Sequence, residues 1–185
     1  MNTAAQQRAE VLERLTSAVN TLEQSIDTRI LPEEGANIGY AIAGARDKNG
    51  VAGVPGGIVR TDGGIRASGS CAFGADEVIA RIILTAMKFD PLVRSAATIR
   101  YSKKIIPVLE GMFLLCKVFS RRNAPPGTST MDWGIASCCK DEVPDVIYTN
   151  DSTKDPTLIC IFGEEPADVT NNIIMLSNRI IHIEL

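Results

Sequence analysis

Residues 51–89 read VAGVPGGIVRTDGGIRASGSCAFGADEVIARIILTAMKF, a glycine-rich stretch that is followed at once by a helical pattern. Glycine lets the backbone adopt positive φ and lets a ligand approach the main chain. A helix that begins directly after such a turn presents unpaired N–H groups and a partial positive charge to an anion. The stretch is therefore typical of a binding loop that leads into a helix. The alternative is a plain glycine-rich hairpin between two core elements, and the pattern alone favours that alternative.

The composition describes a globular chain. Its 185 residues suit one domain, or one domain with an arm, and 45% of them are apolar. No run of about 18 apolar residues indicates a membrane-spanning helix, and the polar N-terminal stretch lacks the apolar core of a signal peptide. We therefore expect a cytoplasmic protein that makes no membrane contact. The net charge of −3 argues against a nucleic-acid surface within the chain itself.

The cysteines and the one histidine exclude much of metal and acid–base chemistry. Cysteines stand at five positions without the paired spacing of a zinc site: Cys71, Cys116, Cys138, Cys139 and Cys160. His182, the single histidine, lies in an apolar run near the C-terminus and is expected to have no role. Catalysis that depends on histidine is therefore largely excluded, and we expect neither a metal nor a cofactor.

Residues 4–26 carry the pattern of one helix. Their apolar positions fall three or four residues apart and form a narrow stripe, closer to a coiled-coil seam than to a broad core face. Three arrangements remain open for this helix. It can pack on the domain, pair with a second copy of the chain, or connect to something upstream.

The rest of the chain alternates between strand-like and helix-like segments. Strands are expected at 38–42, 57–60, 99–101, 112–119, 145–148 and 158–162. Helices are expected at 76–88, 91–96, 102–109, 131–140 and 166–180, and a polar turn at 150–156. In the helix that Asp76 caps, Val78 and Ile79 are expected to begin the buried stripe. Short loops between interleaved strands and helices predict an α/β fold, with a sheet covered by helices on both faces.

Several blocks of the sequence resemble one family. These are NIGYAIAGAR (37–46), VAGVPGGIVR (51–60), FGADEVIARIILTAMKFDPLVRSAATIRYS (73–102), and PDVIY (144–148) followed by KDP and IFG. In this order they are similar to the ThiN domain of the archaeal thiamine phosphate synthase family, over about residues 26–178. The resemblance implies a three-layer α/β/α sandwich with a mixed, largely antiparallel sheet. It divides the chain into a linker or dimerisation helix at 1–26 and a ligand-binding domain at 27–185.

Two positions depart from the pattern that the resemblance implies. The family enzyme joins a pyrimidine diphosphate to a thiazole phosphate and releases pyrophosphate, and its pattern has an arginine after Val-Pro-Gly and a histidine in the next block. Gly57 and Val78 stand at these places. The first lacks a cation for the leaving diphosphate and the second lacks a proton donor. We therefore expect a non-catalytic homologue rather than an enzyme. The alternatives are a synthase that uses other residues, and an oligomerisation domain with a relic pocket.

The same departure resembles a second branch of the family. In that branch a ThiN-like domain is the effector-binding part of a thiamine-responsive transcriptional repressor. The resemblance implies that thiamine phosphate or thiamine diphosphate is the ligand, and that the chain forms a homodimer. It further implies that DNA is contacted only through a helix-turn-helix domain that this chain does not contain.

The glycine pattern and the resemblance together give a set of candidate ligand-binding residues. For phosphate, we expect main-chain groups in the glycine turn and at the helix start that follows it. These are Gly56, Gly57 and Ile58 in the turn, and Phe73, Gly74, Ala75 and Asp76 at the helix start. Asp76 is explained as well by an N-cap with no other role.

Two arginines and an asparagine extend this set. Arg46 follows a strand and a glycine, where a cation can meet phosphate, although a solvated surface arginine is the alternative. Arg81 lies mid-helix among apolar neighbours, and a structural arginine paired with an acid explains it equally well. Asn37 is expected to hydrogen-bond an aminopyrimidine ring.

The remaining candidates stand where the family pattern matches this chain. Arg100 and Asp145 complete the predicted ligand-binding residues. Tyr101 and Lys154 also match, but we favour packing for Tyr101 and a surface turn for Lys154. Trp133 has an aromatic face that can stack on a ring, yet a buried tryptophan is the commoner case.

Overall fold

The structure is a computed structural model that describes residues 3–150 and 157–185. Its strands are β1 (Ile38–Ala41), β2 (Val51–Gly53), β3 (Ile58–Thr61), β4 (Gly64–Ala67), β5 (Ala72–Phe73), β6 (Ser95–Arg100), β7 (Cys116–Phe119), β8 (Val146–Thr149) and β9 (Leu158–Gly163). Its α-helices are α1 (Ala4–Ser25), α2 (Glu77–Met87), α3 (Ile105–Gly111), α4 (Thr130–Cys138) and α5 (Pro166–Arg179). Most of the predicted elements are therefore confirmed. Most of the polar turn predicted at 150–156, from residue 151 on and including Lys154, lies outside the described residues.

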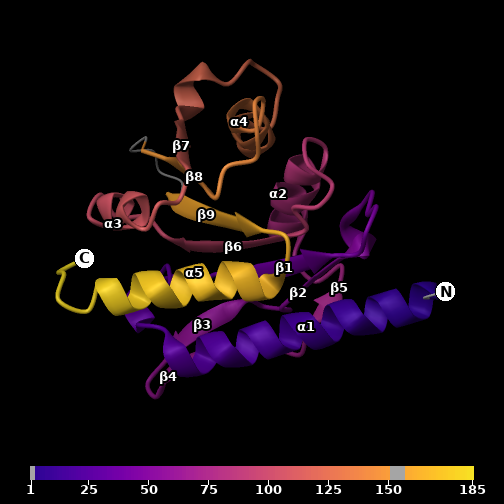
Figure 1. Cartoon of the computed structure of the whole chain (residues 1–185), viewed down its shortest axis with the longest axis horizontal. Coiled ribbons are helices and arrows are strands. Elements are labelled where there is room, and N and C mark those ends of the chain that lie inside the picture. Colours follow the sequence, from indigo (N-terminus) through magenta and orange to yellow (C-terminus); the bar gives the residue numbers. More distant parts are fainter. Residues whose placement is uncertain (1–2, 151–156) are drawn as a thin grey trace.

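Seven strands form one sheet in the order β5-β2-β1-β6-β9-β8-β7, and β3 and β4 form a separate two-stranded sheet. Every pairing in the large sheet is antiparallel except that of β7 with β8. Figure 1 shows this sheet between two layers of helices. The prediction of a three-layer α/β fold with a mixed, largely antiparallel sheet is confirmed.

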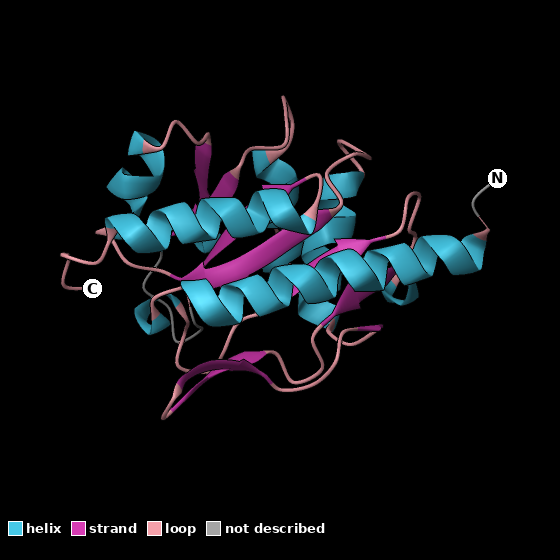
Figure 2. Cartoon of the chain, turned by 60° about the horizontal axis from the view of Figure 1, so that its bottom comes forward, coloured by secondary structure: helices cyan, strands magenta, loops and turns pink. Residues whose placement is uncertain are grey.

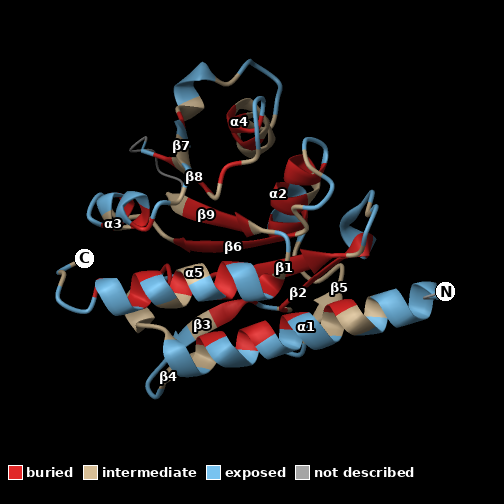
Figure 3. Cartoon of the chain, viewed as in Figure 1, coloured by how far each residue is buried: buried red, intermediate tan, exposed pale blue. Residues whose placement is uncertain are grey.

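Each face of the sheet builds its own core. Successive side chains of a strand point to opposite faces, so in β6 Ala97 and Ile99 join the core under α1, α3 and α5, whereas Ala96 joins the core under α2 and α4. The central strands β1, β6 and β9 are buried on both faces, as Figure 3 shows. Helices on both faces explain why these strands read as apolar runs rather than alternating ones.

The first helix packs along the domain. A capping box of Thr3 and Gln6 begins it, and Val11, Leu15 and Leu22 are buried in its stripe. It lies beside α5 across one face of the sheet (Figure 2). The division of the chain at residue 26 stays a prediction. None of the helices in the described residues has both the length and the apolar composition needed to cross a membrane.

Three predicted details are wrong. Residues 91–96 are not a helix, because Ser95 and Ala96 already belong to the fully buried strand β6. Residues 112–119 are not one buried strand: only Cys116–Phe119 pairs, at the sheet edge, where Val118 is 47% exposed. Val78 is 55% exposed instead of joining the buried stripe of α2, because it lies in the first turn of the helix and faces outward.

The glycine-rich stretch folds as a hairpin that leaves the large sheet and returns to it. The chain runs from β2 into the pair β3–β4 and comes back as β5, directly before α2. Gly56 and Gly57 both have a φ of +75° at the turn out of β2. Such values are strained for other residues, so these two glycines set the path of the chain at that turn.

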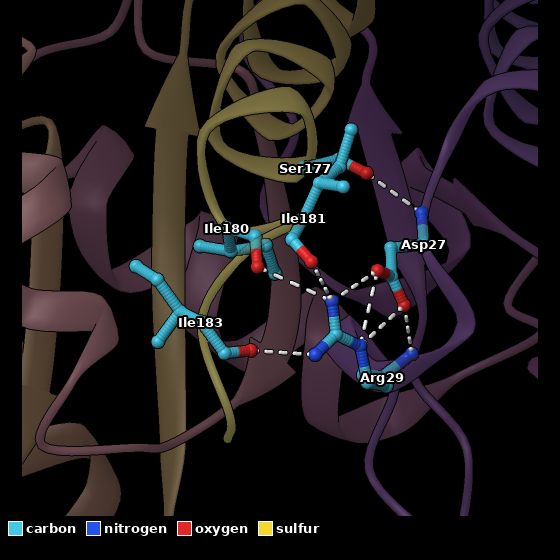
Figure 4. A network of polar contacts seen from close by, with 6 residues as sticks. All are labelled: Asp27, Arg29, Ser177, Ile180, Ile181 and Ile183. Atoms are coloured by element: carbon cyan, nitrogen blue, oxygen red, sulfur yellow. Dashed lines mark hydrogen bonds and ion pairs between the residues drawn. The ribbon is translucent and has the colours of Figure 1, made fainter.

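An arginine ties the segment after α1 to the end of α5 (Figure 4). Arg29 forms an ion pair with Asp27 at 2.7 Å and donates to the carbonyl oxygens of Ile180 and Ile183, at 3.2 and 2.6 Å. The Asp27 amide donates to the hydroxyl oxygen of Ser177 at 2.6 Å. Hydrogen bonds from Arg29 hold the pKa of the Asp27 carboxyl below its usual value.

Candidate functional site

A buried asparagine joins β1, β2 and α2. Asn37 precedes β1 and is 5% exposed. Its Nδ2 donates to the Val54 carbonyl and to Asp76 Oδ2, both at 2.9 Å. Its Oδ1 accepts from the amides of Ile38 and Val54, at 2.9 and 3.0 Å. An asparagine side chain offers two donor hydrogens and two acceptor lone pairs, so this one is saturated by protein partners.

Asp76 is the N-cap of α2. Its Oδ1 accepts from the Ile79 amide at 2.8 Å, while its Oδ2 accepts from Asn37. A carboxylate at this position is stabilised by the unpaired amides and partial positive charge of the helix end. The amides of Glu77 and Val78, the first two residues of α2, have no partner within the helix. They remain available to a ligand.

Asn37, Asp76 and Val78 line a cavity of 180 Å³. Its polar and glycine residues are Glu34, Gly35, Asn37, Gly56, Gly57, Asp76 and Thr98, and its apolar residues are Ala36, Val78, Ile79 and Leu158. The glycine turn, the start of α2 and the ends of β6 and β9 therefore meet at one place. Two carboxylates line the cavity, which favours a ligand that is positively charged or rich in hydrogen-bond donors at this end.

Several amides that were predicted to bind phosphate are already used in the fold. Gly57 donates to the Val54 carbonyl at 2.9 Å, and Ile58 donates to Ala36 at 2.8 Å. Gly74 donates to Val51 at 3.0 Å. Close turns need these hydrogen bonds, so an anion at this cavity would use Gly56 and the first turn of α2 instead.

Arg100 is not among the lining residues, but it follows one of them on the same face of β6. Side chains alternate along a strand, so Arg100 shares a face of β6 with Thr98, which lines the cavity. Its Cα partner across the β6–β9 ladder is Leu158, which also lines the cavity. No carboxylate of the described residues pairs with Arg100 within 4.0 Å.

Four other predicted residues lie away from the cavity. Arg81 forms an exposed ion pair with Asp132 of α4 at 2.7 Å, and this pairing raises the pKa of the Arg81 guanidinium. Arg46 is exposed beyond the far end of β1. The ring of Phe73 lies under the Arg8 guanidinium at 3.7 Å. Asp145 precedes β8 and accepts from the Leu115 amide at 2.8 Å.

Ala75, Tyr101 and Trp133 do not line the cavity either. Ala75 is half-buried in the loop before Asp76. Tyr101 stacks on Tyr148 at 6.0 Å between ring centroids, on the sheet face opposite to Arg100. Trp133 packs edge-on against Phe119 at 6.5 Å. These contacts support packing roles for Tyr101 and Trp133.

The described residues offer no metal site. No group of three histidine, cysteine or acidic side chains in them is arranged to hold a metal ion. Burial raises the pKa of Cys160 to about 12 and the pKa of Cys139 to about 11. Both side chains are therefore protonated thiols at neutral pH rather than thiolate ligands.

Seven of the eleven cavity residues were outside the predicted ligand-binding set, and Glu34, Thr98 and Leu158 are three of them. Glu34 lies in a loop without a motif, and Leu158 was assigned only to a strand core. Thr98 could have been found, because it lies two residues before Arg100 and so shares its face of the strand. The predicted strand began at residue 99, one residue too late to show this.

The protein-family comparison gives the identity of the domain. The family model described as thiamine-phosphate synthase ThiN matches residues 14–175. The chain belongs to the ThiN family. The matched region includes the second half of α1 and the whole cavity.

Two curated relatives and one solved structure are similar to this ThiN domain. The bifunctional thiamine biosynthesis protein ThiDN of Methanocaldococcus jannaschii is 32% identical over 90% of this chain, which spans only 40% of that protein. The thiamine-phosphate synthase ThiN of Methanothermobacter thermautotrophicus is 26% identical over 85% of this chain and 87% of its own length. The crystal structure of the C-terminal domain of a phosphomethylpyrimidine kinase is 33% identical, with a TM-score of 0.84 over 91% of this chain and 99% of that one.

These comparisons correct the functional hypothesis. The expectation of a non-catalytic domain from a transcriptional repressor is wrong, because the family model and both curated relatives are named for thiamine biosynthesis. Neither relative is named as a regulator of transcription. Gly57 and Val78, at the two positions that depart from the family pattern, are therefore not by themselves a sign of a regulatory domain.

Proposed function

We propose that this ThiN domain is a thiamine-phosphate synthase. It joins a hydroxymethylpyrimidine diphosphate to a thiazole phosphate, releasing pyrophosphate and thiamine phosphate. The observation that carries the proposal is the meeting of Gly57 and Val78 with Asn37 and Asp76 in one 180 Å³ cavity. The two positions where the resemblance implies catalytic residues therefore face the same space in this chain, although they are far apart in the sequence.

The reaction is favoured by protein groups of opposite charge at the two ends of the bond that breaks, the bond between the methylene carbon and the diphosphate oxygen. The thiazole nitrogen attacks the methylene carbon of the pyrimidine, and the bond from that carbon to the diphosphate oxygen breaks. The methylene becomes electron-poor while negative charge grows on the leaving diphosphate. The carboxylates of Glu34 and Asp76 stabilise the electron-poor methylene. The first-turn amides of α2, together with Arg100, stabilise the negative charge of the leaving diphosphate.

The geometry also explains why Gly57 carries no side chain. A Cβ atom at this position would lie 2.7 Å from the Ala36 carbonyl oxygen, and φ is +75°. An arginine here would need a different turn. Arg100 shares a face of β6 with Thr98 of the cavity lining, and we propose that it supplies the cation that the turn cannot carry.

Turnover by the full chain tests the proposal. Incubation with both substrates should release thiamine phosphate and pyrophosphate in equal amounts, measured by chromatography, and neither substrate alone should give product. Arg100→Gln should lower kcat by at least about tenfold, a typical effect of losing one charge-stabilising group. Arg46→Gln is the matched control, because Arg46 is exposed at the other end of β1, and it should leave kcat unchanged. Thiamine phosphate binding without any product would overturn the proposal.

A further inference from the structure

A second cavity, of 270 Å³, lies at the other end of β1 and on the opposite face of the sheet. Helix α1 contributes Gln7, Glu10, Val11 and Arg14, β1 and the turn after it contribute Tyr40, Ile42 and Ala43, and the remaining two residues are Arg94 and Glu165. No residue of the candidate synthase cavity is among them. The second cavity is therefore separate from the proposed synthase cavity.

One wall of this cavity carries a positive charge without a counter-ion. The Arg94 guanidinium lies over the Tyr40 ring, 4.7 Å from its centroid, and donates to the Tyr40 hydroxyl oxygen. Tyr40 is 2% exposed and forms the floor. Arginine has five N–H donors, and no carboxylate of the described residues lies within 4.0 Å of Arg94. A half-buried guanidinium in this state can bind an oxyanion.

The side of the cavity formed by α1 and the start of α5 carries a net negative charge. Arg14 pairs with Glu10 at 2.5 Å and with Glu165, the N-cap residue of α5. One arginine between two carboxylates leaves an excess of one negative charge. The side chains of these three residues are 43 to 45% exposed, so they form the rim rather than the floor. A positively charged group at the rim can share the two carboxylates with Arg14.

We propose that this second cavity binds a small zwitterion, with its oxyanion at Arg94 and Tyr40 and its ammonium group at Glu10 and Glu165. A simple anion would meet the two carboxylates, and a simple cation would meet Arg94. A molecule with both charges meets an opposite charge at each wall. The cavity volume of 270 Å³ lies just below the range of about 300–1,000 Å³ found for pockets that hold drug-sized ligands, so it suits a smaller molecule. Amino acids and phosphorylated amines are of this size.

Titration calorimetry on the full chain tests the proposal with two zwitterions, β-alanine and phosphoethanolamine. Acetate, inorganic phosphate and ethanolamine are the matched single-charge probes. We expect at least one zwitterion to bind about tenfold or more tightly than either of its single-charge counterparts. The ratio between the two zwitterions then tells whether the oxyanion is a carboxylate or a phosphate.

Variants place the binding at this cavity. Arg94→Gln should remove the preference for a zwitterion over ethanolamine, and Glu10→Gln should weaken the preference over acetate or phosphate. Arg46→Gln, which changes an exposed arginine outside the cavity, should leave both unchanged. Because the Glu10 side chain is 44% exposed, its variant tests the proposal even where Arg94→Gln folds poorly. Equal binding of zwitterions and single-charge probes, or zwitterion binding that neither variant alters, would overturn it.

Discussion

The two ends of β1 handle buried polar groups in opposite ways. At the end where the strand begins, every donor and acceptor of the Asn37 side chain has a protein partner. Three residues further on, Tyr40 carries the Arg94 guanidinium, most of whose donors have no partner among the described residues. A cavity lies at each end.

The difference separates architecture from binding capacity. A saturated network such as that of Asn37 has nothing left for a ligand, but it holds the glycine turn and the start of α2 in one arrangement. It gives the candidate synthase cavity its shape, and the end of α2 gives it a partial positive charge. At Tyr40 the reverse holds, because the unpaired charge of Arg94 is itself the binding group.

The largest expected effect on stability comes from removing the Asn37 side chain, whose hydrogen bonds are all made within the protein. Asn37→Ala leaves the Val54 carbonyl and amide and the Ile38 amide without partners in a buried site, so we expect the free energy of unfolding to fall by about 3–5 kcal/mol. Urea denaturation measures this change. Asn20→Ala on the exposed face of α1 is the control, and its effect should stay within about 0.5 kcal/mol. A small effect of Asn37→Ala would show that the network is not what shapes this end of the sheet.

The second prediction compares the two positions that differ from the family pattern. Gly57→Arg should lower the free energy of unfolding by about 1–3 kcal/mol, because φ is +75° and Ala36 leaves no room for a Cβ. Val78→His should leave stability nearly unchanged, since Val78 is 55% exposed in the first turn of α2. Thermal unfolding of the two variants beside the parent chain measures both. Equal losses would mean that the turn does not exclude a side chain at 57.

Sequence reasoning predicted the elements whose periodicity is long enough to read. The helix at 4–26 and the last helix were predicted from apolar spacing, and both packed as amphipathic helices do. The strands β2, β4 and β5 were missed because segments of three, four and two residues carry little or no periodicity. Residues 91–96 were wrongly predicted as a helix, since alanine and serine give little signal for a buried central strand.

The candidate site was predictable where it depends on residues close in sequence. Gly56, Gly57 and Asp76 all belong to the glycine-rich stretch at 51–89, and they line one cavity with Asn37. The hydrogen bonds that occupy Asn37 and the Gly57 amide could not be predicted, because they depend on how β1, β2 and α2 meet. Arg46 lies away from that cavity because Asn37 precedes β1 and Arg46 follows it, so the length of the strand separates them.

The third prediction concerns an arginine whose charge is fully paired, in contrast to Arg94. Arg29 depresses the pKa of Asp27 in the folded state, so the pair stabilises the fold at pH values above the ordinary aspartate pKa. This contribution is lost as the pH falls through the lower, folded-state pKa. Asp27→Asn should therefore be less stable than the parent chain at neutral pH, and the difference should shrink below about pH 4. Chemical denaturation across pH 3 to 7 checks this, and a constant difference would contradict it.

The smallest effect is expected at the rim of the second cavity. Arg14 pairs with Glu10 and Glu165 where all three side chains are more than 40% exposed, so solvent screens both ion pairs. Exposed pairs contribute about 0.2–1 kcal/mol each. Arg14→Gln should therefore cost at most about 1 kcal/mol, and added salt should shrink the loss. The same variant leaves Glu10 and Glu165 without their cation, so ethanolamine should bind it more tightly than it binds the parent chain. A large, salt-independent loss of stability would instead make Arg14 part of the architecture, like Asn37, and would remove the contrast between the two ends of β1.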